Sequence, residues 1–268
     1  MTSFERQRAD ERDKLQEALT RVLQDDARVD AAWLFGSFGR GDADVWSDLD
    51  VVIVVADDAF DEYLADRYTV VSKLGKVVLS FESSFNGPPG GCYLMTGYES
   101  ATGLMLVDWY WQPHRAARMP NSKAVLVSRN PVEKYDNPDE SLVTLWQAPG
   151  HEPPLPLWNP TDAEDRANCG VLAWAMLAIQ TKHVARKPDE PGLGFQEFIE
   201  KLVSRATYKS EDELRPGDPA QLTTWPDRLD RLEALAEKLR TPVAGGASPA
   251  ESYGRFLATV RAHCVARN

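Results

Sequence analysis

Two aspartates separated by a single residue are the first feature of this sequence that could carry chemistry. Asp48 and Asp50 stand at the start of an apolar segment that reads LDVVIVVA over residues 49–56. The side chains of a strand alternate between the two faces of a sheet, so both carboxylates project to the same side. Adjacent carboxylates repel each other unless a cation lies between them. Because Mg²⁺ prefers oxygen ligands, usually together with substrate phosphates, the pair predicts a site for one or two Mg²⁺ ions.

The residues just before this pair are suited to bind phosphate. Gly36 and Ser37 end the preceding apolar segment, and ten residues separate Ser37 from Asp48. A glycine lets a ligand approach the backbone, whose N–H groups can donate to phosphate oxygens together with the serine hydroxyl. Arg40 and Ser47 lie in the same loop. They could hold the outer phosphates, since the planar arginine fork matches phosphate oxygens.

The string GSFGRGDADVWSDLD, residues 36–50, resembles the signature of the nucleotidyltransferase superfamily, which has the fold of DNA polymerase β. That signature is Gly-Ser or Gly-Gly, a spacer of about this length, and Asp-x-Asp on a strand. The match includes Arg40 and the serine before the first aspartate. In plan the chain is most similar to the aminoglycoside and other antibiotic O-nucleotidyltransferases. The motifs fall within residues 30–111, and the resemblance of the C-terminal half is only architectural.

The resemblance implies a third carboxylate on a later strand beside the first two. Asp108 matches best, because it lies inside the apolar run LMLVDWYW, where a carboxylate is costly to bury unless it is paired or bound to metal. Glu82, at the end of the preceding expected strand, is the alternative. One of the aromatic residues after Asp108 could face the site and stack on a nucleobase or a sugar. The resemblance also implies a lysine that reaches the nucleotide phosphates; the candidate is Lys182, although lysines on that helix are expected to be exposed.

The elements that position these residues follow from hydrophobic periodicity. Helices are expected over residues 3–24 and 58–73, and a loop over 86–91, which contains two prolines and three glycines. Apolar and β-branched runs predict five strands, at 29–35, 49–56, 76–81, 104–111 and 123–128. The order αββαβββ predicts an α/β (α+β) class, with a small mixed sheet and helices packed on it.

The C-terminal half has a different pattern. Residues 131–160 are rich in proline and are interpreted as a linker or a packed loop. Helical periodicity then predicts four helices, at 161–187, 195–208, 225–239 and 248–266. The predicted organisation is a nucleotidyltransferase domain at 1–130, the linker at 131–160, and a helical substrate-binding domain at 161–268.

Charge and composition narrow the classes of partner. Of the 268 residues, 43% are hydrophobic and 26% charged, which are ordinary values for a globular protein. The net charge is −11, and residues 25–66 alone hold twelve acidic and two basic side chains. Within that stretch Asp42 and Asp44 are interpreted as solvated loop acids. An acidic balance argues against a nucleic-acid partner and suits a cationic one.

The sequence also predicts a location. It contains no run approaching the ~18–20 apolar residues of a membrane span, so no membrane partner is expected. The first residues are too charged for a signal peptide. Three cysteines without a pairing pattern fit a reducing compartment, and a cytoplasmic protein is predicted. The oligomeric state is left open.

These features together predict a Mg²⁺-dependent enzyme that transfers a nucleoside monophosphate, AMP from ATP, to a hydroxyl of a small cationic acceptor. Aminoglycosides are the favoured acceptors, with lincosamides as near neighbours. Asp48 and Asp50 are expected to hold the metal, and Asp108 to complete the metal site or to act as general base. Two alternatives stay open: a nucleotidyltransferase that modifies a protein, and a regulatory module that binds nucleotide without turnover.

Overall fold

The structure is a computed structural model that describes residues 2–83, 86–135, 146, 153, 162–207, 222–239 and 249–267. Close contacts divide the chain into two compact units. The first, which we call the sheet unit, comprises Ala9–Thr96 and Leu106–Asn159. The second, the helical unit, comprises Met1–Arg8, Gly97–Met105 and Pro160–Asn268. The predicted boundaries at 130 and 160 stay predictions, because most of the predicted linker 131–160 lies outside the described residues.

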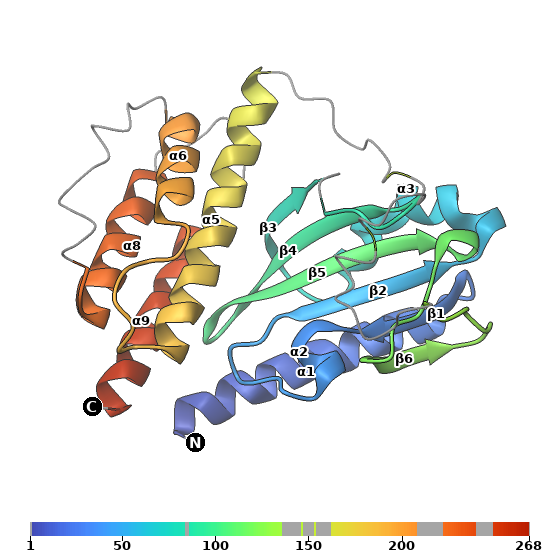
Figure 1. Cartoon of the computed structure of the whole chain (residues 1–268), viewed down its shortest axis with the longest axis horizontal. Helices are drawn as coiled ribbons and strands as arrows, with labels where there is room; N and C mark the ends of the chain where they lie inside the picture. The colour runs from blue at the N-terminus through green and yellow to red at the C-terminus, as the bar shows by residue number, and fades with distance from the viewer. Residues whose placement is uncertain are drawn as a thin grey trace. The chain divides into compact units, whose positions relative to one another are not determined.

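A mixed sheet of six strands forms in the described part of the chain, in the order β3-β4-β5-β2-β1-β6 (Figure 1). Strand β2 pairs in parallel with β5, and β1 pairs antiparallel with both β2 and β6. The sheet confirms the predicted fold class. Its strands are β1 (Val29–Leu34), β2 (Leu49–Val55), β3 (Val77–Glu82), β4 (Cys92–Ser100), β5 (Gly103–Pro113) and β6 (Ala124–Ser128).

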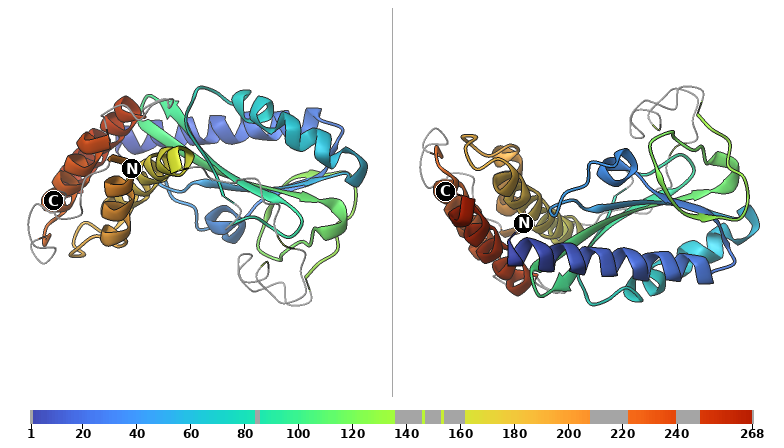
Figure 2. Two further views of the ribbon diagram at one scale, coloured as in Figure 1. Left: turned by 90° about the horizontal axis from the view of Figure 1, so that it is seen from above. Right: turned by 90° about the horizontal axis from the view of Figure 1, so that it is seen from below.

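Helices lie on both faces of this sheet. Figure 2 shows α1 (Ser3–Asp25) and α3 (Phe60–Ser72) on one face and the short α2 (Gly36–Arg40) on the other. The predicted apolar stripe of α1 is buried, at Leu15, Leu19 and Leu23. Two 3₁₀ helices join these elements, η1 (Asp57–Ala59) and η2 (His114–Ala116).

Two features differ from the sequence prediction. The strand β4 was not predicted, because Gly97 and several polar residues interrupt its apolar pattern; the strand gains its stability by pairing on both sides, with β3 and β5. The segment after β1 was predicted as a loop, and it forms α2 instead. Two of the five α2 residues are glycines, which disfavour a helix, so contacts with the rest of the fold decide its conformation.

The helical unit contains the helices that periodicity predicts: α5 (Asp162–Arg186), α6 (Gln196–Thr207), α8 (Trp225–Leu239) and α9 (Ala250–Arg267). The Thr181 hydroxyl lies 2.9 Å from that of Tyr253, which ties α5 to α9. Near the start of α1, Arg8 lies over the Phe256 ring and donates to the Leu104 carbonyl at 3.1 Å. Within the described ranges no helix combines the length and the apolar character that crossing a bilayer requires.

Candidate active site

The structure brings Asp50 and Asp108 together at the centre of the sheet. They are direct register partners on the parallel strands β2 and β5, so their side chains share one face. Asp108 is only 9% exposed, and Asp48 and Asp50 are half-buried. We call this face of the sheet, on which α2 also lies, the carboxylate face.

The pKa of Tyr110 is affected by all three candidate carboxylates. It follows Asp108 by two residues and therefore lies on the same face. Burial raises the pKa of Tyr110 well above its ordinary value, and the negative charges of Asp108, Asp50 and Asp48 raise it further. The phenol is therefore protonated at neutral pH, and it lies in the field of three negative charges.

The backbone at Gly36 is built against the Asp50 carboxylate. Gly36 has a φ of +59°, and a Cβ atom added there would lie 2.3 Å from Asp50 Oδ2. The preceding residue, Phe35, donates its N–H to the Asp50 carbonyl at 3.0 Å. The sequence predicts that a ligand can approach the backbone at Gly36. In the structure, the group that lies close to this backbone is the Asp50 carboxylate of the candidate site.

This contact yields a prediction for Gly36→Ala. The alanine would lower the free energy of unfolding by ~1–2 kcal/mol through its left-handed backbone. It would also displace the Asp50 carboxylate, and a shift of about 1 Å at a reacting centre can cost roughly 10²-fold in rate. Gly41→Ala is the matched control, because Gly41 also has a positive φ, of +77°, but nothing lies within 4 Å of its added Cβ. Equal activities of the two purified variants would contradict the prediction.

The candidate phosphate-binding residues differ in their surroundings. Ser37 is half-buried in α2, and its hydroxyl has no hydrogen-bond partner among the described residues. Arg40 is exposed and pairs with Asp42 at 3.2 Å. The Ser47 hydroxyl is 3.1 Å from Asp44 Oδ1 and accepts the Asp44 N–H at 3.0 Å.

These contacts revise the interpretation of two residues. Asp44 is half-buried and closes the turn that leads into β2, so its interpretation as a solvated acid was wrong. The Ser47 hydroxyl takes part in the same turn, which positions the chain just before Asp48. Its role at phosphate stays a prediction.

Three further ionisable side chains, of which Glu82 and Lys182 were predicted candidates, are paired elsewhere or belong to the other unit. Glu82 pairs with Arg67 of α3 at 2.5 Å, a contact that favours Asp108 as the third carboxylate. His114 pairs with Asp30 at 2.6 Å, beyond the opposite end of β2 from Asp50. Lys182 belongs to the helical unit and is 4% exposed, so the expectation of an exposed lysine was wrong.

The aromatic residues of β5 divide between the two faces. Trp109 and Trp111 are fully buried and stacked, with ring centroids 5.7 Å apart. Tyr110 lies on the carboxylate face, but it is 7% exposed and packs against other rings. Its centroid is 5.0 Å from Tyr93, 5.1 Å from Phe35 and 5.0 Å from Trp146. Little of its surface is therefore accessible for stacking on a ligand.

Tyr93 is a residue that the sequence did not point to. Its hydroxyl donates to Asp108 Oδ1 at 2.6 Å, and its side chain is 2% exposed. Burial raises the pKa of Tyr93 well above its ordinary value, and the negative charge of Asp108 raises it further. It was missed because β4 was not predicted, so nothing in the sequence placed it beside Asp108.

One arginine of the acidic stretch 25–66 pairs with three of its acids. Arg28 pairs with Asp26, Glu62 and Asp66 at 2.7, 3.3 and 2.8 Å. Hydrogen bonds to Asp26 and Asp66 raise the pKa of Arg28, which keeps it charged. These three acids lie at the Arg28 cluster, which keeps a net negative charge.

The donor atoms at the predicted metal site are carboxylate oxygens. Across the described ranges, no three His, Cys, Asp or Glu side chains form a ready-made metal site. The chemistry of the set still suits a hard cation, because Asp50 and Asp108 are register partners on neighbouring strands, Asp48 precedes Asp50 by two residues, and Mg²⁺ prefers carboxylate oxygens. The metal role of Asp48, Asp50 and Asp108 stays a prediction.

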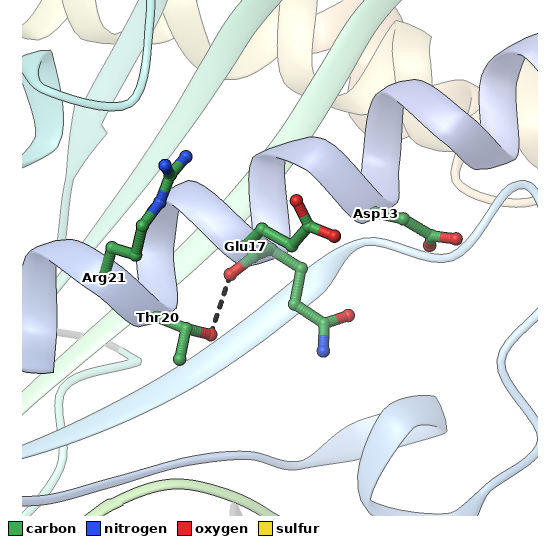
Figure 3. A pocket seen from close by; sticks show the side chains of 5 residues that line it. Asp13, Glu17, Thr20 and Arg21 are labelled. Carbon is green, nitrogen blue, oxygen red and sulfur yellow. Dashed lines mark hydrogen bonds between the residues drawn. The ribbon is translucent and has the colours of Figure 1, made fainter.

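A cavity of about 640 Å³ lies elsewhere, along α1 (Figure 3). One helix supplies its polar lining, and the Thr20 hydroxyl donates to the Gln16 carbonyl at 2.8 Å. None of the predicted site residues lines it. The lining residues are Asp13, Gln16, Glu17, Thr20 and Arg21.

Comparisons with known proteins agree with the motif. Residues 15–81 match the family described as nucleotidyltransferase domain, which confirms the resemblance. No curated protein matches the chain. A matching solved structure is the STING-associated CdnE c-di-GMP synthase from Capnocytophaga granulosa, at 14% identity, covering 96% of this chain and 82% of that one. Its TM-score of 0.25 is too low to support any conclusion about this chain.

Proposed function

The chain contains a nucleotidyltransferase domain at residues 15–81, and from that premise we propose that it transfers AMP from ATP to a hydroxyl of a small cationic acceptor, in a Mg²⁺-dependent reaction. The observation that carries the proposal is the direct pairing of Asp50 with Asp108 at the centre of the sheet. Asp48 lies immediately before β2 and two residues before Asp50, which supports a shared site.

Each residue has a proposed role. Asp48, Asp50 and Asp108 would hold one or two Mg²⁺ ions. When bound, the metal would neutralise negative charge on the phosphates of the nucleotide. Ser37 and the backbone of α2 would contact the triphosphate, with Arg40 at the outer phosphates. Lys182 is kept as a further phosphate-binding candidate.

The reaction needs a proton acceptor near the acceptor hydroxyl. In the proposed step the hydroxyl oxygen forms a bond to the α-phosphorus, the bond to the β-phosphate oxygen breaks, and pyrophosphate leaves. Asp108 would take the hydroxyl proton in this step. Positioning of the two substrates and electrostatic stabilisation supply most of the catalysis in such transfers.

An aminoglycoside-type acceptor is proposed on charge and chemistry. The proposed site contains three acidic residues in a chain with a net charge of −11, which favours a polyamine over an anionic acceptor. Aminoglycosides combine amines with hydroxyls, and lincosamides are the next candidates. We also propose a cytoplasmic location, because the three cysteines, at positions 92, 169 and 264, are buried and form no disulfide bond within the described part of the chain. Modification of an antibiotic would confer resistance in that compartment.

The decisive experiment is incubation of the purified protein with α-labelled ATP, Mg²⁺, and either an antibiotic panel or a cell lysate. A labelled aminoglycoside is the expected product. The Asp48→Ala variant should give none, whereas Asp61→Ala, which removes an exposed acid of α3, should keep full activity. A labelled protein from the lysate would replace the proposal with protein modification. Binding of ATP without any labelled product would indicate a regulatory module.

A further inference from the structure

The carboxylate of Asp108 is held by a buried tyrosine on the neighbouring strand. The Tyr93 hydroxyl donates to Asp108 Oδ1 at 2.6 Å, which is short for a hydrogen bond between two oxygens. Both residues are nearly inaccessible, with exposures of 2% for Tyr93 and 9% for Asp108. The bond therefore forms in a weakly solvated environment, where it fixes direction more firmly than at a surface.

The tyrosine itself has little freedom to move. Its ring packs on Tyr110, with centroids 5.0 Å apart and an angle of 38° between the planes. Tyr110 in turn packs on Phe35 and Trp146. Because β4 and β5 are neighbours in the sheet, the main chain also fixes the distance between Tyr93 and Asp108.

We propose that Tyr93 is a positioning residue, which orients the Asp108 carboxylate for binding of the divalent cation. This inference rests on the proposed function. A carboxylate on a strand can rotate about its side-chain bonds, and a fixed donor on one oxygen restricts that rotation. A phenol suits this role better than a lysine or an arginine, because it donates a hydrogen bond without bringing a positive charge close to the cation.

A hydrogen bond of this kind also bears on how well a carboxylate binds a metal. Hydrogen bonds to ligating carboxylates orient them, and the loss of such a partner typically costs 10–100-fold in metal affinity or activity. The Gly36 backbone packs against Oδ2 of Asp50, and the Tyr93 hydroxyl donates a hydrogen bond to Oδ1 of Asp108. Each of the two paired carboxylates is thus constrained by a different part of the fold.

The test is the Tyr93→Phe variant of the full chain, with Mn²⁺ as the probe. Binding is measured by electron paramagnetic resonance in the presence of a non-hydrolysable ATP analogue. The expected result is an affinity for Mn²⁺ about 10–100-fold weaker than that of the unmodified chain. The control is Tyr253→Phe, which also removes a buried tyrosine hydroxyl, 2.9 Å from that of Thr181, but in the helical unit. Its Mn²⁺ affinity should be unchanged.

A double-mutant cycle tests whether Tyr93 acts through Asp108. Once Asp108 is replaced by alanine, the further change Tyr93→Phe should have no effect on Mn²⁺ affinity. A Tyr93→Phe variant with unchanged affinity and a lowered melting temperature would overturn the positioning role and leave a purely structural bond. An equal loss of affinity with and without Asp108 would also overturn it. Failure of the unmodified chain to bind Mn²⁺ would overturn the proposed function together with this inference.

Discussion

Replacing Asp50 with alanine is expected to lower the rate of nucleotidyl transfer by about 10³-fold or more in a protein that still folds. A bound metal supplies several kcal/mol of charge stabilisation in the transition state, and each ~1.4 kcal/mol corresponds to a factor of ten. Stability should not fall, because the substitution removes one member of a group of mutually repelling carboxylates. Asp48→Ala should behave similarly.

The measurement combines single-turnover transfer of labelled AMP with a thermal melt of each variant. Asp61→Ala serves as the control for loss of a negative charge from the same acidic stretch, since Asp61 is exposed on α3. An Asp50→Ala variant with near-normal turnover would show that the metal assignment is wrong. A variant that loses both turnover and its folded state would instead indicate a structural role for this carboxylate.

The second large effect is expected for Asp108→Asn, which separates the two roles of this residue. Asparagine keeps the size of the side chain and an oxygen that can accept the Tyr93 hydroxyl, which lies 2.6 Å from Asp108 Oδ1. It loses the charge and the basicity. For a general base, kcat should fall by ~10²–10⁴, nucleotide binding should survive, and added Mg²⁺ should not restore the rate. The acidic limb of the pH profile should then disappear, because that limb reports protonation of the base.

A metal ligand would respond differently to the same substitution. The affinity for Mg²⁺ should fall, and raised Mg²⁺ should recover part of the activity. We expect a mixture of the two responses, because a carboxylate beside the metal pair can serve both roles. Activity and Mg²⁺ dependence equal to those of the unmodified chain would exclude Asp108. Glu82 would then be the next candidate, although it would have to leave its ion pair with Arg67.

The sequence by itself determined most elements and the central motif. Long β-branched runs such as residues 49–56 have few alternatives to a buried strand, and apolar residues at helical spacing specified α1 and the helices of the helical unit. The spacing from Gly36 to Asp50 was enough to predict the resemblance to the nucleotidyltransferase superfamily, and the model of that domain family matches residues 15–81.

Only the tertiary structure decided which side chains meet. The pairing of Asp50 with Asp108 depends on the register of two strands that lie more than fifty residues apart, and register is a property of the assembled sheet. The strand β4 lacks a clear apolar pattern, so the contact of Tyr93 with Asp108 had no local signal. The close fit of Gly36 to the Asp50 carboxylate and the pairing of Glu82 with Arg67 likewise arise from packing between distant segments, which local sequence patterns do not encode.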